Sequence, residues 1–167
     1  LSERTEANCP HLYDKRDVHK LLTCDWFVRR FLAWRPTTID CAVKCVADAM
    51  KWRHALAIND CIIFKNDTYF PVEFYRLAAC FSYLPDREGN NVLIIRLKNN
   101  RRDPILKAHF DELARKYFIY VCERIVSQHS HRGFAIIFDC HGASLSNVDL
   151  DFARFIISTL SNYYADY

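Results

Sequence analysis

Glycine is scarce in this chain, whose 167 residues include only Gly89, Gly133 and Gly142. Glycine-rich loops let backbone amides approach phosphates, and neither G-x-x-x-x-G-K-[ST] nor G-x-G-x-x-G occurs. No apolar run reaches the roughly 18 residues that a transmembrane helix needs. The first residues, L-S-E-R, lack a signal core and an initiator methionine, which indicates a processed end or a segment boundary. These absences argue against a nucleotide cradle and a membrane span.

A complete catalytic or metal-binding set is also missing. His129 and His131 precede a short apolar segment and Asp139 follows it, which separates them by roughly 20 Å if the segment is a strand. Zinc needs three or four ligands that converge at about 2.0–2.3 Å. Cys140 and His141 are adjacent, so on a strand they point to opposite sides and cannot act as nucleophile and base. We therefore expect no enzyme, no metal and no cofactor.

The composition is that of a folded protein, because 51% of the residues are hydrophobic, 14% are aromatic and charges of both signs are spread along the chain. The net charge of +3 is too small to indicate nucleic acid as a partner. Of the eight cysteines, Cys41 and Cys45 share a helical face, and several others lie in apolar runs. We expect reduced, buried thiols in the cytoplasm, with a single disulfide such as Cys9–Cys24 as the open alternative.

The first third has the periodicity of helices. Apolar residues between Val18 and Leu32 indicate one or two short helices before Pro36, and Thr37 with Asp40 predicts a capping box. An apolar i, i+3, i+4, i+7 stripe then runs to about Arg53. Residues 1–60 are therefore expected to form an N-terminal helical unit.

From Phe74 onwards the pattern changes to strands and longer helices. Residues 74–84 and 92–97 are predicted as two strands joined by the turn P-D-R-E-G-N-N. A helix follows from about Phe110 to Ile125, then the strand F-A-I-I-F-D, of a type buried on both faces, and a last helix that Asp149 and Asp151 begin. The fold class is thus α/β, with an incomplete mixed sheet of about three strands over residues 61–167. An apolar sheet with an uncovered edge is unfavourable, so we expect Y-Y-A-D-Y to lie within a domain and not at its end.

One cluster of basic residues stands out, formed by Arg96, Lys98, Arg101 and Arg102. A solvated loop explains it, and contact with an anionic lipid surface is the functional alternative.

Two stretches together resemble the CRAL-TRIO family of lipid carriers. The first runs from Arg29 to Arg53, R-R-F-L-A-W-R-P-T-T-I-D-C-A-V-K-C-V-A-D-A-M-K-W-R, and is similar to the family's N-terminal helical signature. The second is G-F-A-I-I-F-D-C-H-G with the helix ending in Y-Y-A-D-Y, and P-D-R-E-G-N-N-V between them is similar to the family's hairpin. Ala165 departs from the proline of the family pattern. The resemblance covers nearly the whole chain and implies that the sequence stops part-way through the lipid-binding domain.

The resemblance implies a non-enzymatic domain that binds one hydrophobic molecule or phospholipid between a sheet and its helices. The expected ligand-lining residues are Tyr117, Tyr120, Val121, Phe134, Ile136 and Phe138, although ordinary core packing would require the same residue types. An apolar surface left open would favour a homo-oligomer, through the pocket face or the free sheet edge. The alternative is a protein-interaction module that has the scaffold but no ligand. The expected location is the cytoplasm, with peripheral contact to membranes.

Overall fold

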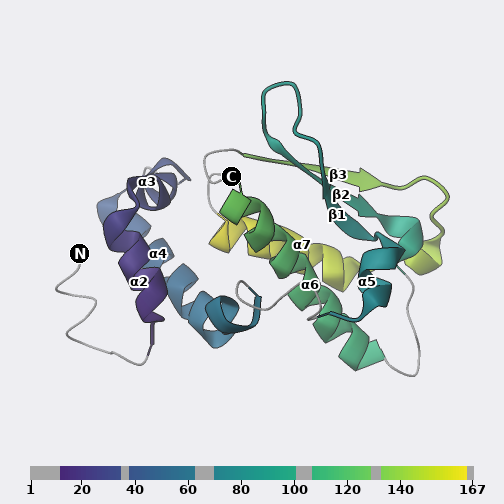
Figure 1. Cartoon of the computed structure of the whole chain (residues 1–167), viewed down its shortest axis with the longest axis horizontal. Coiled ribbons are helices and arrows are strands. Elements are labelled where there is room, and N and C mark those ends of the chain that lie inside the picture. The colour runs from purple at the N-terminus through teal and green to yellow at the C-terminus, as the bar shows by residue number, and fades with distance from the viewer. Residues whose placement is uncertain (1–11, 35–37, 63–69, 101–106, 129–132, 165–167) are drawn as a thin grey trace. The chain divides into compact units, whose positions relative to one another are not determined.

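The computed structural model describes residues 12–34, 38–62, 70–100, 107–128 and 133–164 (Figure 1). By its internal contacts the chain divides into two compact units. One comprises Leu1–Phe64 with Thr159–Tyr167, and the other comprises Lys65–Ser158. The domains predicted at residues 1–60 and 61–167 stay a prediction.

The first unit consists of short helices around a small aromatic core. These are α2 (Lys15–Thr23), α3 (Asp25–Trp34), α4 (Ile39–Ala55) and the π-helical turn η1 (Ile58–Ile62). Predicting Thr37 as the cap of α4 was wrong by one residue: the Thr38 hydroxyl accepts the Cys41 amide, at 3.2 Å, and Thr37 lies outside the described residues. The core gathers Phe27, Phe31, Val46, Ala49 and Met50.

An ion pair is buried in this unit. Arg53 Nε donates to Asp17 Oδ1 at 2.9 Å, and the two side chains are only 7% and 2% exposed. The end of the chain also packs here: Tyr163 stacks on Trp52 with ring centroids 4.1 Å apart, and Thr159 and Tyr164 are buried. Residues 159–164 therefore belong to the same compact unit as the N-terminal helices.

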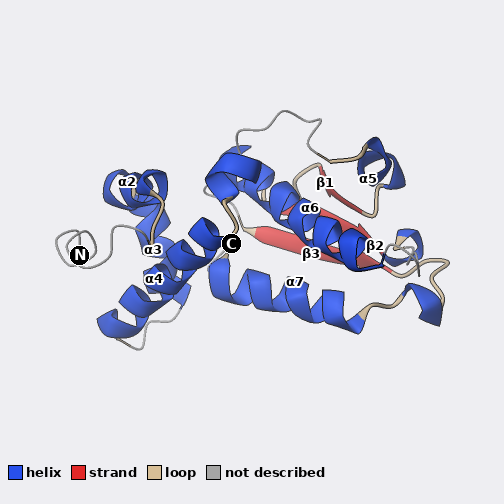
Figure 2. Ribbon diagram, turned by 90° about the horizontal axis from the view of Figure 1, so that it is seen from below, coloured by secondary structure: helices blue, strands red, loops and turns tan. Residues whose placement is uncertain are grey.

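The second unit is a three-stranded mixed sheet with helices on one face, which confirms the predicted α/β class (Figure 2). The strands are β1 (Cys80–Tyr83), β2 (Asn91–Arg96) and β3 (Phe134–Asp139), in the order β1-β2-β3. β1 pairs antiparallel with β2, and β2 pairs parallel with β3 through the crossover helix α6 (Lys107–Gln128). The helices α6 and α7 (Leu150–Tyr163) lie along the same face of the sheet.

The predicted strand over residues 74–84 was partly wrong, because its first part is the helix α5 (Val72–Leu77) and only Cys80–Tyr83 is extended. Aromatic residues favour strands in isolation, but here Phe74 stacks on Phe110 of α6, with ring centroids 5.2 Å apart. Packing against α6 therefore overrides the local preference. Ala78, in the left-handed region at φ 46°, ends the helix and turns the chain into β1.

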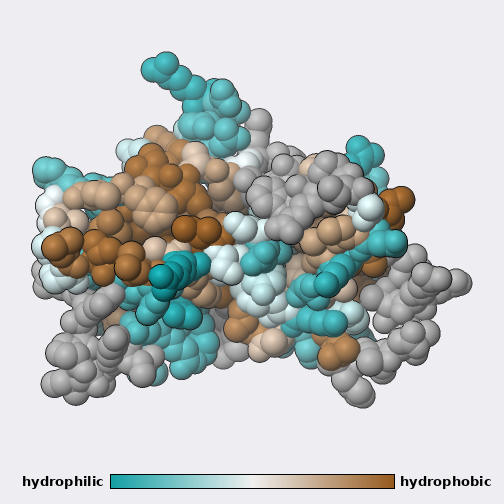
Figure 3. Space-filling model, turned by 180° about the vertical axis from the view of Figure 1, so that it is seen from behind, coloured by the Kyte–Doolittle hydropathy of each residue, from teal (hydrophilic) through white to brown (hydrophobic). Residues whose placement is uncertain are grey.

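β3 has the predicted bounds but not the predicted burial on both faces. Ile137 and Phe138 are 49% and 45% exposed, and among the described strands β3 pairs with β2 alone. Tyr83 of β1 is also exposed, and Figure 3 shows a broad apolar area on the side of the molecule seen from behind.

Six of the eight cysteines have side chains that the structure describes, and none of these six is in a disulfide. Cys24, Cys41, Cys45, Cys80, Cys122 and Cys140 are free, with Cys80 and Cys122 buried. Cys9, the alternative partner of Cys24, lies outside the described residues.

Candidate functional site

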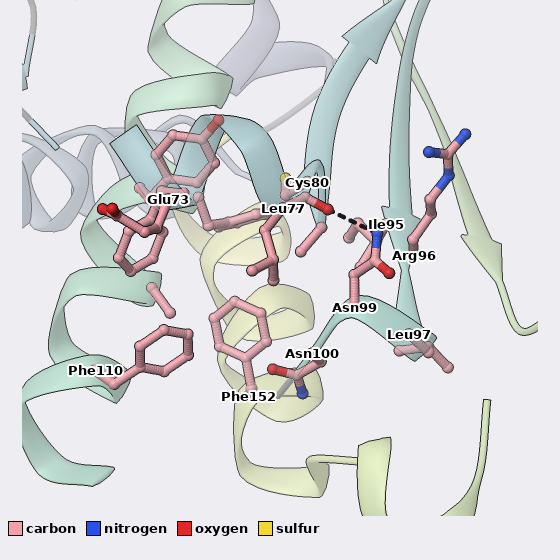
Figure 4. A pocket seen from close by; sticks show the side chains of 15 residues that line it. Glu73, Leu77, Cys80, Ile95, Arg96, Leu97, Asn99, Asn100, Phe110 and Phe152 are labelled. Atoms are coloured by element: carbon pink, nitrogen blue, oxygen red, sulfur yellow. Dashed lines mark hydrogen bonds between the residues drawn. The ribbon is translucent and has the colours of Figure 1, made fainter. Parts of the chain in front are cut away.

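A mostly apolar pocket opens in the second unit between the sheet and its helices (Figure 4). Its volume is about 80 Å³, several times the space that one water-sized group needs. The lining comes from α5, β1, β2, the short helix η2 (Leu97–Asn99), α6 and α7, and consists of Glu73, Phe74, Leu77, Ala79, Cys80, Ile95, Arg96, Leu97, Asn99, Asn100, Phe110, Ala114, Tyr117, Phe118 and Phe152. The pocket can therefore hold an apolar group of a few carbons.

The helical wall follows from the spacing of residues on α6. Phe110, Ala114 and Tyr117 are four and three residues apart, so they lie on one helical face. Phe74 of α5 packs between the two aromatic members, with ring centroids 5.2 Å from Phe110 and 5.5 Å from Tyr117. The small Ala114 side chain between these rings leaves the space that the pocket occupies.

The sheet wall combines buried uncharged residues with Arg96 at the end of β2. Cys80 and Ile95 are paired across β1 and β2, share one face and are 6% and 5% exposed. Burial raises the pKa of the Cys80 thiol from 9.0 to about 12, and burial also raises the pKa of the Tyr117 hydroxyl to about 12. These shifts show that the surroundings of both side chains disfavour charge, which suits a hydrophobic ligand.

Two asparagines hold the rim in place. Asn99 Nδ2 donates to the Leu77 carbonyl at 2.7 Å, which ties η2 to the end of α5 (Figure 4). Asn100 Nδ2 donates to the Asn147 carbonyl at 3.1 Å, and Asn147 Nδ2 returns a bond to the Asn100 carbonyl at 3.2 Å. Hydrogen bonds from side-chain amides therefore fix the backbone segments at this end of the pocket.

Of the residues predicted to line a ligand, Tyr117 lines this pocket. Tyr120 and Val121 are buried farther along α6 and are not part of its wall. The Tyr120 ring packs against Phe70, with centroids 5.4 Å apart, and its hydroxyl accepts Arg124 Nη1 at 3.0 Å. Their proposed contact with a ligand stays a prediction.

The β3 residues Phe134, Ile136 and Phe138 lie on one face of the strand. In the parallel register Ile136 pairs with Leu93 and Phe138 pairs with Ile95, so they share the sheet face that carries Ile95 into the pocket. None of the three lines the pocket itself. Phe138 is in the same cross-strand row as Ile95 and Cys80, and a ligand longer than the pocket would follow this row.

The basic cluster is only partly described. The Arg96 guanidinium points away from the pocket (Figure 4), lies over the Phe81 ring at 4.9 Å and is 3.6 Å from Asp139 Oδ2. Lys98 is exposed, and Arg101 and Arg102 lie outside the described residues. The contact of these four residues with an anionic lipid stays a prediction.

Sequence reasoning missed most of the wall, including Phe74, Leu77, Phe110, Ala114 and Phe152. The available signal was the α6 stripe, whose N-terminal half holds Phe110 and Ala114. Interpreting residues 74–77 as a strand hid the contribution of α5, since α5 is placed by contacts that are distant in sequence.

The described residues contain neither a metal-binding cluster nor a helix that could span a membrane. No group of three or more His, Cys, Asp or Glu side chains there could hold a metal ion, and His129 and His131 lie outside this part of the chain. Likewise, no helix within the described ranges is long and apolar enough to cross a membrane.

Two comparisons with known proteins indicate the same family. Residues 76–167, more than half of the chain, match the CRAL/TRIO domain. A CRAL-TRIO domain-containing protein of Schizosaccharomyces pombe is 24% identical over 147 residues, which cover 85% of this chain. The aligned part is 41% of that relative, so the chain spans less than half the length of the yeast protein.

Proposed function

Because the chain belongs to the CRAL/TRIO domain family, we propose that it binds a hydrophobic ligand, with the ligand's apolar part in the pocket beside Cys80 and Ile95. The observation that carries the proposal is the apolar pocket inside the segment that matches the family. Eleven of its fifteen lining residues are apolar or aromatic, and Glu73, Arg96, Asn99 and Asn100 are the exceptions.

Burial of hydrocarbon supplies the affinity. Each methylene group transferred from water contributes about 0.8 kcal/mol, so a chain of ten or more carbons can bind strongly. The pocket volume of about 80 Å³ accommodates only part of such a chain. The rest would lie along Phe138 and the other β3 residues predicted to line the ligand, Phe134 and Ile136, which share the sheet face of Ile95.

The family consists of lipid carriers, and the proposed activity is binding without catalysis. The surroundings of Cys80 and Tyr117 support this activity, because burial raises both pKa values and so disfavours charge at the wall. Lys98, together with Arg96, Arg101 and Arg102, is the proposed contact to an anionic membrane surface during ligand exchange, in a cytoplasmic protein.

Self-association is the second candidate, and the exposed apolar residues of the sheet favour it. Ile137 and Phe138 on β3 and Tyr83 on β1 are 49%, 45% and 64% exposed. Exposed apolar surface and unpaired strand edges both favour association with another chain. In this alternative the scaffold acts as an interaction module without a ligand, and sedimentation at micromolar concentration would detect its oligomer.

Native mass spectrometry of the purified chain tests both candidates together, because it reports bound small molecules and subunit number. We expect a copurifying lipid of several hundred daltons. A ligand-free chain that is a tight oligomer would contradict the binding proposal and favour the interaction module.

A further inference from the structure

An exposed leucine projects from the short helix η3 (Leu145–Asn147), which follows β3 in the second unit. The Leu145 side chain is 93% exposed, the largest exposed fraction among the large hydrophobic residues that the structure describes. Val148 and Leu150, a few residues later, are 38% and 64% exposed. Because a 3-10 helix repeats every three residues, Leu145 and Val148 lie on the same side of this segment. Leu145, Val148 and Leu150 are called the η3 surface below.

Hydrogen bonds hold this segment in place, so the exposure of Leu145 is part of the fold. The Asn147 side-chain oxygen accepts the Ser144 amide at 2.9 Å and the Ser144 hydroxyl at 2.8 Å. Asn147 Nδ2 donates to the carbonyls of Lys98 and Asn100, at 3.3 and 3.2 Å. The backbone is therefore fixed on both sides of Leu145 and is tied to η2.

A lysine lies beside the η3 surface. Lys98 is exposed on η2, and its Cδ atom lies 3.8 Å from the position that a Cβ atom would take at Gly142. The aliphatic stem of Lys98 therefore runs along the segment that precedes η3. Among the described residues, Lys98 belongs to no ion pair. Its ammonium group is thus available to a partner that contacts Leu145.

The described charges at this edge of the sheet balance one another. Two ion pairs account for most of them, Arg96 with Asp139 at 3.6 Å and Arg154 with Asp151 at 3.3 Å. The Asp149 carboxylate, whose Oδ1 accepts the Phe152 amide at 3.0 Å, offsets the charge of Lys98. Apolar contact must therefore supply most of the affinity of this surface for a partner, and Lys98 adds a local contact.

The η3 surface lies close to one end of the apolar pocket. Because β2 and β3 are parallel, the segments that follow them, η2 and η3, lie at the same edge of the sheet. Asn100, which donates to the Asn147 carbonyl, and Phe152, two residues after Leu150, both line the pocket. Figure 4 shows Asn100 and Phe152 at the same end of the pocket. A partner that covers Leu145 would therefore lie near this end.

A phospholipid bilayer fits this surface. A leucine that projects from a fixed turn can enter the boundary between head groups and acyl chains, and it needs no matching groove in the partner. A lysine beside it can lay its aliphatic stem on the apolar layer and keep its ammonium group at the level of the phosphates. Zwitterionic and anionic lipids both carry this phosphate, so both kinds of bilayer can accept the surface.

We propose that the η3 surface docks on a phospholipid bilayer, with Leu145 inserted between the head groups and Lys98 at the level of the phosphates. This inference rests on the membrane contact in the proposed function, and it names the residue that inserts. It also assigns the larger share of that contact to an apolar segment and the smaller share to the basic cluster.

Flotation of the full chain with vesicles tests the proposal, with phosphatidylcholine alone and with phosphatidylserine added. We expect the parent chain to bind both kinds of vesicle. Leu145→Ser should lower the partition coefficient about tenfold on both, because a leucine side chain is no longer transferred from water. Leu84→Ser is the matched control and should bind like the parent chain. Leu84 is 70% exposed and belongs to the turn between β1 and β2, at the opposite edge of the sheet.

Two further variants separate insertion from charge. Lys98→Gln should lower partition about fivefold on vesicles that contain phosphatidylserine, and less on phosphatidylcholine alone. Leu145→Trp places a fluorescent ring at the inserted position, so its emission, after subtraction of the parent spectrum, should shift to shorter wavelength when vesicles are added. Leu84→Trp should show no such shift.

Several results would overturn the proposal. Equal partition of the parent chain and Leu145→Ser would exclude insertion of Leu145, as would an unshifted Leu145→Trp spectrum on bound vesicles. A parent chain that forms a Leu145-dependent oligomer in sedimentation and floats with neither vesicle would assign the surface to a second copy. Absence of flotation together with binding of dodecanol in solution would overturn the docking alone and leave the proposed ligand binding in place.

Discussion

At the scale of single residues, the Asp17–Arg53 ion pair is the most consequential polar contact in the first unit. Both side chains are almost fully buried, and the second oxygen of Asp17 has no hydrogen-bond partner among the described residues. Removing one member of a buried pair leaves the other charge uncompensated. We expect Arg53→Met to lower the free energy of unfolding by roughly 3–5 kcal/mol, measured by urea denaturation.

Arg16 provides the matched control, because it also pairs with aspartates but at the surface. Its Nη2 atom lies 2.6 Å from Asp14 and 2.7 Å from Asp60, and its side chain is 46% exposed. Arg16→Met should lower the free energy of unfolding far less than Arg53→Met does, because exposed ion pairs contribute little to stability. Equal losses in the free energy of unfolding for Arg53→Met and Arg16→Met would show that burial of the Arg53 pair does not affect stability.

The buried thiols predict a loss of stability in alkali. Burial raises the pKa of Cys80 to about 12 and that of Cys122 well above 9.0, so the folded thiols keep protons that the unfolded chain releases. Their contribution is complete below about pH 9 and is lost as the pH rises towards 12, by about 1.4 kcal/mol per pH unit for each thiol. Denaturation followed by circular dichroism between pH 7 and 11 should show this decline.

The variant Cys80→Ala separates the thiol from other alkaline effects. It will lower stability at pH 7 because it leaves a cavity, but its decline above pH 9 should be shallower than that of the parent chain. Cys140→Ser, at an exposed position, should keep the parent slope. Parallel slopes for the parent and Cys80→Ala would contradict the role of this thiol.

At the scale of elements, the end of α5 holds a backbone conformation that suits glycine. Ala78 has φ 46°, in the left-handed region, which costs a residue with a side chain about 1–2 kcal/mol. Ala78→Gly relieves this strain. The greater conformational freedom of glycine in the unfolded chain opposes this gain and lowers stability by about 0.5–1 kcal/mol. We expect a net stabilisation of about 0.5–1 kcal/mol, seen as a higher Tm.

The opposite sign is expected for the same substitution inside a helix. Ala47 lies in the middle of α4, where glycine costs about 1 kcal/mol, so Ala47→Gly should lower Tm. A lower Tm for Ala78→Gly as well would mean that the left-handed turn carries no strain.

The elements that were predictable from sequence are those with a strong local signal. Three such signals can be recognised within a few residues: the stripe of α6, the apolar run of β3 and the Asp149 cap of α7. The helix α5 has no such local signal, since Phe74 and Leu77 are buried only by packing against α6 and the sheet. The pocket was missed for the same reason, because its wall is assembled from six elements that lie far apart in the sequence.

The predicted site residues show the same limit. Alternation along β3 placed Phe134, Ile136 and Phe138 on one face, and the register agrees. Alternation does not reveal that β3 lies at the end of the sheet order, where Phe138 is exposed. Which side chains meet a ligand depends on the helices packed opposite, and the strand pattern carries no information about them.

At the scale of the whole molecule, the central claim is that the pocket of the second unit binds a hydrophobic ligand. Ala114 lines this pocket, and Ala114→Phe would fill the space between Phe110 and Tyr117. Ala55→Phe, at an exposed position on α4, is the control for adding an aromatic ring. Both variants should retain the circular dichroism spectrum and Tm of the parent chain.

Native mass spectrometry of these three chains, after equal exposure to dodecanol, is the most direct measurement. The account predicts one bound dodecanol on the parent chain and on Ala55→Phe, and at least a tenfold lower occupancy on Ala114→Phe. Equal occupancy on Ala114→Phe would show that the ligand binds elsewhere. Absence of binding to the parent chain would contradict the claim itself.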